Sequence, residues 1–291
     1  MKGKIIPIKK AKIPINDWGL IHSDITYDVV PVVDGGFFRL NDYLDRFFAS
    51  MNSLRLDPRM TKSEIRNALL WMVSVTGLKN SYVAMVCSRG VPEVLGSRDP
   101  RHCKNYFYAW CVPYIHVIKP EVVAKGATAL ISEEVRRISE KSVDPLVKNY
   151  HWGDFTKGLF EAKDLNYETV ILCDQFENIT EGPGFNVFAV KDEMLMTSDH
   201  GVLSGITRKT VLEIAKNIGL GIEEKSLKKT EILDADEVFI SSSGGGVIPL
   251  VRVNSTIFSN GVCGPITKKL RNAYWDFMQN PKYRTEVNYP D

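Results

Sequence analysis

Two kinds of apolar spacing alternate along this chain of 291 residues, and they constrain its fold class more than any other feature. Leu44, Phe47 and Met51 recur at intervals of three and four residues, the spacing of a helix that buries one face. Runs of β-branched and aromatic residues at 82–87 and 106–111 predict strands instead. Because both patterns occur in both halves of the chain, we predict a mixed α+β fold.

Turn and cap signals place the ends of further elements. The Asp-Gly-Gly sequence at 34–36, between two apolar runs, is typical of a β-hairpin. Thr61, followed three residues later by Glu64, forms a capping box that opens a helix. Another helix is expected to open at Thr207, and Pro265 is a suitable first residue for the closing helix.

A proline-bracketed stretch in the middle of the chain suggests a domain boundary. Residues 113–120 begin and end with proline and follow the last strand of the first half. We therefore predict a small N-terminal domain at 1–112, a linker at 113–120 and a larger C-terminal domain at 121–291.

Composition excludes several classes of function. The 37 basic and 35 acidic residues are mixed along the chain, which argues against a nucleic-acid partner. No apolar run approaches the roughly 18 residues of a membrane span, and the first residues lack a secretory signal, so a cytoplasmic protein without a membrane role is expected. Five widely spaced cysteines without a CxxC pair argue against both a disulfide framework and a zinc site.

Three features of the sequence suit a phosphorylated ligand. Gly-Ile-Thr at 205–207 opens a predicted helix, whose N-terminus favours an anion. The Ser-Ser-Ser-Gly-Gly-Gly turn at 241–246 lies between two predicted strands and offers hydroxyls and open backbone. Arg46 lies off the apolar stripe of its helix, and a guanidinium matches phosphate geometry. Taken singly, each is more often an ordinary structural feature, namely a capped helix, a flexible glycine turn or a solvated surface arginine. No GxGxxG or GxxxxGK[ST] motif is present.

One lysine stands in an unusual setting. Within 144–154, DPLVKNYHWGD, Lys148 has apolar and aromatic neighbours and precedes a helix that Asp154 could cap. An amine removed from water is more readily neutral and nucleophilic, as a lysine that binds a carbonyl cofactor must be. By itself such a lysine is more often a surface residue.

The segment 178–188, NITEGPGFNVF, resembles the TE-x-x-x-x-N signature of class IV aminotransferases. In that family a lysine lies some tens of residues before the glutamate, as Lys148 lies before Glu181 here. Within the family, the sequences HSDITYDV at 22–29, GITRK at 205–209 and GPITKK at 264–269 are most similar to R-selective amine transaminases.

The resemblance implies pyridoxal 5′-phosphate as cofactor and assigns residues to it. Lys148 is the catalytic residue and would hold the cofactor as a Schiff base, while Glu181 would face the ring nitrogen. The residues implied for the phosphate are Arg46, Ile206, Thr207, Ser242 and Ser243. No metal is implied.

The family also implies a substrate pocket and an assembly. The implied substrate-binding residues are His22, Tyr27, Val29, Ala84, Arg98, Trp152 and Gly244. Arg98 lies in the Gly- and Pro-containing loop 89–104 and would bind the keto-acid carboxylate. We expect His22 to form part of the pocket wall or of the structure rather than to act as a base, because a lysine already serves that purpose. A homodimer with active sites near its interface is implied.

The expected activity is transfer of an amino group between an amine or amino acid, of R-amine, D-amino-acid or branched-chain type, and a 2-keto acid such as pyruvate. The expected architecture is the two-domain fold type IV, with a small α/β domain and a larger, barrel-like mixed domain. Two alternatives stay open: a branched-chain L-amino-acid aminotransferase, and a lyase of the same fold such as aminodeoxychorismate lyase. A cofactor-binding protein without activity is disfavoured because Lys148 and Glu181 are both present.

Overall fold

The computed structural model describes residues 3–290, which form two compact units. The first unit contains the chain up to Ile115, the short segment Val147–His151 and the chain from Pro281 onward. The second contains His116–Leu146 and Trp152–Asn280. The units are therefore not contiguous in sequence, whereas the sequence divides the chain only once, at 113–120.

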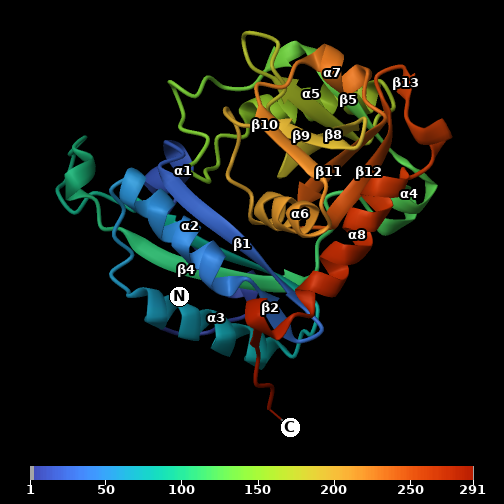
Figure 1. The fold of residues 1–291 in the computed structure, drawn as a ribbon. Helices are drawn as coiled ribbons and strands as arrows, with labels where there is room; N and C mark the ends of the chain where they lie inside the picture. Colours follow the sequence, from blue (N-terminus) through green and yellow to red (C-terminus); the bar gives the residue numbers. More distant parts are fainter. Residues whose placement is uncertain (1–2, 291) are drawn as a thin grey trace. The chain divides into compact units, whose positions relative to one another are not determined.

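The first unit is an antiparallel sheet with two long helices (Figure 1). Its elements are α1 (Trp18–Ile21), β1 (Ile25–Val33), β2 (Gly36–Phe38), α2 (Leu40–Ser53), α3 (Lys62–Thr76), β3 (Ser81–Ser88), β4 (Tyr106–Pro113) and β14 (Arg284–Glu286). The strand order is β14-β2-β1-β3-β4, and every pair is antiparallel. Helix α2 packs against β1, and α3 packs against β3 and β4.

Local signals in the sequence account for these elements. The predicted hairpin is confirmed: Asp34 and Gly35, with φ of 49° and 85°, join β1 to β2 in the left-handed conformations that a two-residue hairpin loop requires. The capping box at Thr61 and Glu64 is also confirmed, and it opens α3. Leu44 and other apolar residues of α2 are buried, as the helical stripe predicts.

The second unit is built on a nine-stranded sheet that mixes parallel and antiparallel pairs. Its elements are α4 (Pro120–Lys125), β5 (Ala127–Arg136), α5 (Gly153–Asp164), β6 (Thr169–Cys173), β7 (Glu181–Gly182), β8 (Phe185–Lys191), β9 (Met194–Ser198), α6 (Ile206–Asn217), β10 (Gly221–Lys225), α7 (Lys229–Leu233), β11 (Glu237–Ser242), β12 (Gly246–Val253), β13 (Thr256–Ile257) and α8 (Pro265–Met278). The main path runs β10-β9-β8-β11-β12-β5-β6. Helix α5 packs on β5 and β6, while α6 and α8 pack on each other and on β11 and β12.

These sheets and helices confirm the predicted mixed α+β class, but two predicted caps are wrong. Helix α6 begins at Ile206 with Gly205 as its N-cap, so Thr207 lies inside the first turn. Helix α5 begins at Gly153, so Asp154 lies inside it. The Asp154 carboxylate instead accepts hydrogen bonds from the Arg137 side chain and the backbone N–H of Ile138. None of the helices between residues 3 and 290 is long and apolar enough to cross a membrane.

Candidate active site

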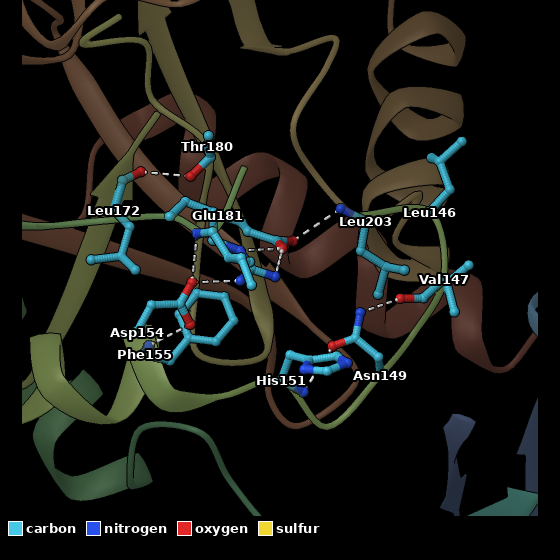
Figure 2. Close-up of polar contacts among 12 residues, drawn as sticks. Leu146, Val147, Asn149, His151, Asp154, Phe155, Leu172, Thr180, Glu181 and Leu203 are labelled. Carbon is cyan, nitrogen blue, oxygen red and sulfur yellow. Dashed lines mark hydrogen bonds and ion pairs between the residues drawn. The ribbon is translucent and has the colours of Figure 1, made fainter. Parts of the chain in front are cut away.

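Glu181 belongs to a buried charge cluster in the second unit (Figure 2). One carboxylate oxygen accepts hydrogen bonds from Nε and Nη2 of Arg137 at 3.3 and 3.2 Å. The other accepts the backbone N–H of Leu203 at 3.0 Å. Arg137 also donates to the Asp154 carboxylate at 2.6 Å, and its guanidinium lies 4.2 Å from the centre of the Phe155 ring. The Glu181 carboxylate is thus held at both oxygens.

The signature that contains Glu181 folds as a tight pair of strands. Glu181 on β7 is the direct cross-strand partner of Asn186 on β8, which explains the spacing of the two residues. Asn186 donates from its side-chain amide to the backbone carbonyl of Leu203 at 2.9 Å. Thr180 donates its hydroxyl to the carbonyl of Leu172 at 2.7 Å, which fixes the start of the segment against β6 (Figure 2).

The chain then enters α6 in a form suited to an anion. Leu203 lies two residues before Gly205, the N-cap, and the first turn contains no acidic residue. The first-turn N–H groups of a helix have no partner within the helix, and the helix dipole favours negative charge there. The Thr207 hydroxyl is buried and makes no hydrogen bond within the described residues. A buried hydroxyl without a partner is costly, so this helix end fits a phosphate.

The turn between β11 and β12 is a second part of the predicted phosphate site. Ser242 donates its hydroxyl to the carbonyl of Gly184 at 2.8 Å and accepts the N–H of Gly244 at 3.1 Å. Gly246 has φ of 68°, and a Cβ there would lie 2.7 Å from the Tyr274 ring, so only glycine fits. Because Ser242 has one hydroxyl proton, a phosphate contact from that hydroxyl requires its bond to Gly184 to be exchanged.

Lys148 lies in the first unit, where its segment runs beside β1. Its carbonyl accepts the backbone N–H of Tyr27 at 3.2 Å and the hydroxyl of Thr26 at 2.7 Å. Its own N–H donates to the Ser50 hydroxyl on α2 at 3.3 Å. The Lys148 ammonium lies 4.6 Å from the centre of the Tyr27 ring, and Tyr150 stacks on the same ring at 4.2 Å. The amine is therefore presented over an aromatic surface.

That aromatic surface continues across the sheet. Val29, Ala84 and Trp110 are neighbours across β1, β3 and β4, and Tyr27 and Tyr108 lie in the next row with Val86 between them. Ala84 is buried and has a short side chain, so it fills less space in this row than Val29 and Trp110 on either side of it. Burial raises the pKa of Tyr108 to about 12.

The strand β4 is less buried than β1 and β3. Every residue of β4 except the exposed Pro113 is partly buried. Tyr108 and Trp110 are pocket candidates that the sequence did not single out. Their alternation with Phe107 and Ala109 was the signal, because residues two apart share one face of a strand.

Arg46 on α2 is fixed by a buried carboxylate. It donates from Nε and Nη2 to the two oxygens of Asp28 at 2.8 and 2.7 Å. Burial opposes the charge of Arg46, but the attraction of Asp28 outweighs it and raises the pKa of Arg46 above its ordinary value. Asp28 is fully buried, so this bidentate pair sets the direction of the guanidinium.

The loop 89–104 presents Arg98 and Arg101 differently. Arg98 is exposed and makes no hydrogen bond or ion pair with any residue between 3 and 290. Arg101 is paired through Nε with the carboxylate of Asp99 at 2.9 and 3.0 Å. Of these two arginines, Arg98 is the one available to a ligand.

Two other predicted pocket residues make edge-on contacts with aromatic rings. His22 is exposed, and its ring packs edge-on against Trp18 at 4.7 Å. Trp152, in the second unit, is partly buried and packs edge-on against Phe155 at 5.6 Å. Across the described part of the chain, no group of three or more His, Cys, Asp or Glu residues could hold a metal ion.

Comparison with known proteins gives a consistent family. The family model described as "Amino-transferase class IV" matches residues 26–253. A protein of Methanocaldococcus jannaschii named "Putative branched-chain-amino-acid aminotransferase" is 29% identical, and the match covers 95% of this chain and 94% of that protein. The D-alanine aminotransferase of Bacillus licheniformis is 26% identical over 93% of each chain.

Solved structures agree with the fold. The branched-chain aminotransferase of Thermoproteus uzoniensis, determined with norvaline, has a TM-score of 0.89 and 25% identity, and the match covers 98% of this chain and 97% of that one. The T.th. branched-chain amino acid aminotransferase, determined with pyridoxamine 5′-phosphate, has a TM-score of 0.90 over 97% of this chain and 96% of that one. Its identity of 23% shows likeness of fold alone.

Proposed function

The chain belongs to the class IV aminotransferases, and from this membership we propose that it is a pyridoxal 5′-phosphate-dependent transaminase that acts on small amines or amino acids and 2-keto acids. One observation carries the cofactor assignment. The peptide of Leu203 joins the Glu181 carboxylate to the start of α6, where the Thr207 hydroxyl is buried without a partner. One short segment, 203–207, therefore contacts a carboxylate suited to a ring nitrogen at its start and offers an anion site suited to a phosphate at its end.

Each half of the cofactor has matching groups in the chain. Glu181 would accept a hydrogen bond from the protonated ring nitrogen, since a buried carboxylate favours a cation beside it. The phosphate would be held by Ile206 and Thr207 at the start of α6, by Ser242 and Ser243 in the β11–β12 turn, and by Arg46. The phosphopyridoxyl compounds bound in relatives of this fold, such as pyridoxamine 5′-phosphate, support the assignment.

Lys148 would perform the proton transfers. Its amine would hold the cofactor covalently, and when free of it the same amine would take a proton from the substrate carbon and deliver it to the cofactor carbon C4′. When bound, the cofactor supplies an electron sink for the substrate carbon. The Tyr27 ring, 4.6 Å from the Lys148 nitrogen, would hold the ammonium in place once it has taken up the proton.

The surface beside Lys148 indicates what kind of substituent the substrate carries. Tyr27, Val29, Ala84 and Trp110 form an apolar face, so we infer that the substrate presents a branched or aromatic group there. His22, Trp152 and Gly244 remain proposed pocket residues. Arg98 would receive the carboxylate of the keto acid.

The decisive experiment is a panel of half-reactions. The holoenzyme is mixed with L-branched amino acids, D-alanine, and R- and S-1-phenylethylamine, and the cofactor absorbance is followed. Conversion by at least one donor, reversed by pyruvate or another 2-keto acid, is expected. Release of pyruvate from a substrate without any keto acid would instead establish a lyase.

A matched pair of variants tests the lysine. Lys148→Ala should abolish covalent cofactor binding and turnover while leaving the circular dichroism spectrum unchanged. Lys157→Ala, which removes an exposed lysine of α5, should behave as wild type. Normal turnover by Lys148→Ala would disprove the assignment.

We also propose a homodimer with active sites near its interface, in the cytoplasm. Val94 and Leu95 on the loop 89–104 are exposed at 51% and 102%, and exposed apolar side chains next to a binding arginine are consistent with a partner surface there. Light scattering of the purified protein tests the assembly, and a strictly monomeric active enzyme would exclude it.

A further inference from the structure

The peptide of Leu203 is held from both sides by the aminotransferase signature. Its N–H donates to Glu181 at 3.0 Å, and Figure 2 marks this hydrogen bond with a dashed line. Its carbonyl accepts the side-chain amide of Asn186 at 2.9 Å and the backbone N–H of Gly205 at 2.8 Å. Leu203 lies between the end of β9 and the start of α6, so these bonds fix the entry of the chain into the helix.

The anchors themselves are rigid. Glu181 and Asn186 are direct partners in the β7–β8 pair, and Asn186 is also the partner of Ser241 on the other side, on β11. Asn186 is 5% exposed. A side chain that projects from the interior of a sheet has few alternative positions. The position of the Leu203 peptide is therefore fixed by the sheet rather than by a loop.

Asn186 also touches the helix cap directly. A Cβ added to Gly205 would lie 2.1 Å from the side-chain oxygen of Asn186. Gly205 is the N-cap of α6, and the unpartnered hydroxyl of Thr207 lies two residues further on. The one amide therefore contacts both ends of the turn that leads to the anion-binding helix end.

We propose that Asn186 is a positioning residue that fixes the separation between the Glu181 carboxylate and the N-terminus of α6, so that one ligand with a ring nitrogen and a phosphate engages both. This inference rests on the proposed function. Two sites held at the correct separation bind a linked ligand far more tightly than either part, because engagement of the second part is then intramolecular. Loss of the amide should remove that advantage and leave each separate site intact.

The test compares a whole ligand with its parts on the cofactor-free protein. Pyridoxamine 5′-phosphate, pyridoxamine and inorganic phosphate are titrated by calorimetry; none of them bonds covalently to Lys148. For Asn186→Ala we expect the affinity for pyridoxamine 5′-phosphate to fall at least tenfold. The affinities for pyridoxamine and for phosphate should each change less than about threefold, because each part can adjust to its own site.

A matched control separates positioning from general loosening of the sheet. Thr197 on β9 is buried, and its hydroxyl donates to the backbone carbonyl of Val187 at 2.7 Å. Thr197→Val removes a buried side-chain-to-backbone hydrogen bond in the adjoining β8–β9 pair without touching Leu203. It should leave all three affinities within about threefold of wild type.

A second variant keeps the test decisive if Asn186→Ala does not fold. Asn186→Leu keeps the approximate volume of the side chain but removes the amide that donates to the Leu203 carbonyl, and it should give the same selective loss. Equal losses for all three ligands, no loss for any, or the same loss in Thr197→Val would overturn the positioning role while leaving the proposed function standing. Failure of the wild-type protein to bind pyridoxamine 5′-phosphate would overturn both.

Discussion

Replacement of Glu181 by glutamine removes one negative charge from the buried cluster without changing the size of the side chain. In the native protein one carboxylate oxygen faces two donors of Arg137 and the other faces the N–H of Leu203. A glutamine has one acceptor oxygen and one donor NH2 group, so it cannot accept on both sides. Whichever way the amide turns, a donor is left facing a donor.

The magnitude follows from what Arg137 retains. Removal of one partner of a buried ion pair costs about 3–5 kcal/mol when the other charge is left uncompensated. Here Arg137 keeps its bond to Asp154, which at 2.6 Å is shorter than its contacts of 3.2 and 3.3 Å with Glu181. The loss is then that of a hydrogen bond to a charged group, about 1.5–3 kcal/mol. We expect the free energy of unfolding of the cofactor-free protein to fall by that amount.

The same substitution should slow the reaction. A neutral amide does not favour a protonated ring nitrogen as a carboxylate does, so the half-reaction rate should fall at least tenfold, which corresponds to about 1.4 kcal/mol of barrier. Urea unfolding of the cofactor-free protein and stopped-flow absorbance of the holoenzyme measure the two effects independently.

Glu177→Gln is the matched control. Glu177 pairs with Arg136, but its side chain is 51% exposed, and exposed pairs contribute about 0–1 kcal/mol. Glu177→Gln should change neither the free energy of unfolding nor the half-reaction rate appreciably. Our account of Glu181 is wrong if Glu181→Gln lies within about 0.5 kcal/mol of wild type in stability and within a factor of about two in rate, because a factor of two is only about 0.4 kcal/mol.

Three further predictions follow from the contacts of single side chains. Thr207→Val should leave the stability of the cofactor-free protein unchanged or slightly higher, because its buried hydroxyl has no partner to lose, yet weaken binding of pyridoxamine 5′-phosphate several-fold by calorimetry; a clear loss of stability would contradict this. Arg98→Ala should raise the apparent Michaelis constant for the keto acid at least tenfold and leave the half-reaction with a carboxylate-free amine unchanged. Arg101 is already paired with Asp99, so Arg101→Ala should change neither the Michaelis constant nor the half-reaction. Burial raises the pKa of Cys87 and Cys173 to about 12, so at pH 8 a thiol reagent should label neither in the native protein and both after unfolding, as read by mass spectrometry.

The strands and long helices could be predicted because their signals are local. The runs that became β3 and β4, and the stripe of Leu44 and Met51 on α2, depend on side-chain spacing alone. Helix ends were less predictable. Thr207 and Asp154 are both good capping residues by type, but each lies inside its helix because the preceding residues already adopt helical or cap geometry.

The supporting contacts of the site could not be predicted. Arg137 stands in the polar sequence VRRISEK at 135–141, where a solvated arginine is the ordinary expectation. It is buried only because the end of β5 brings it to Glu181, and such a pairing depends on tertiary structure rather than on spacing. Asn186 could have been identified as a site residue, because it is the last residue of the signature. The signature does not show that its side-chain amide donates to the Leu203 carbonyl.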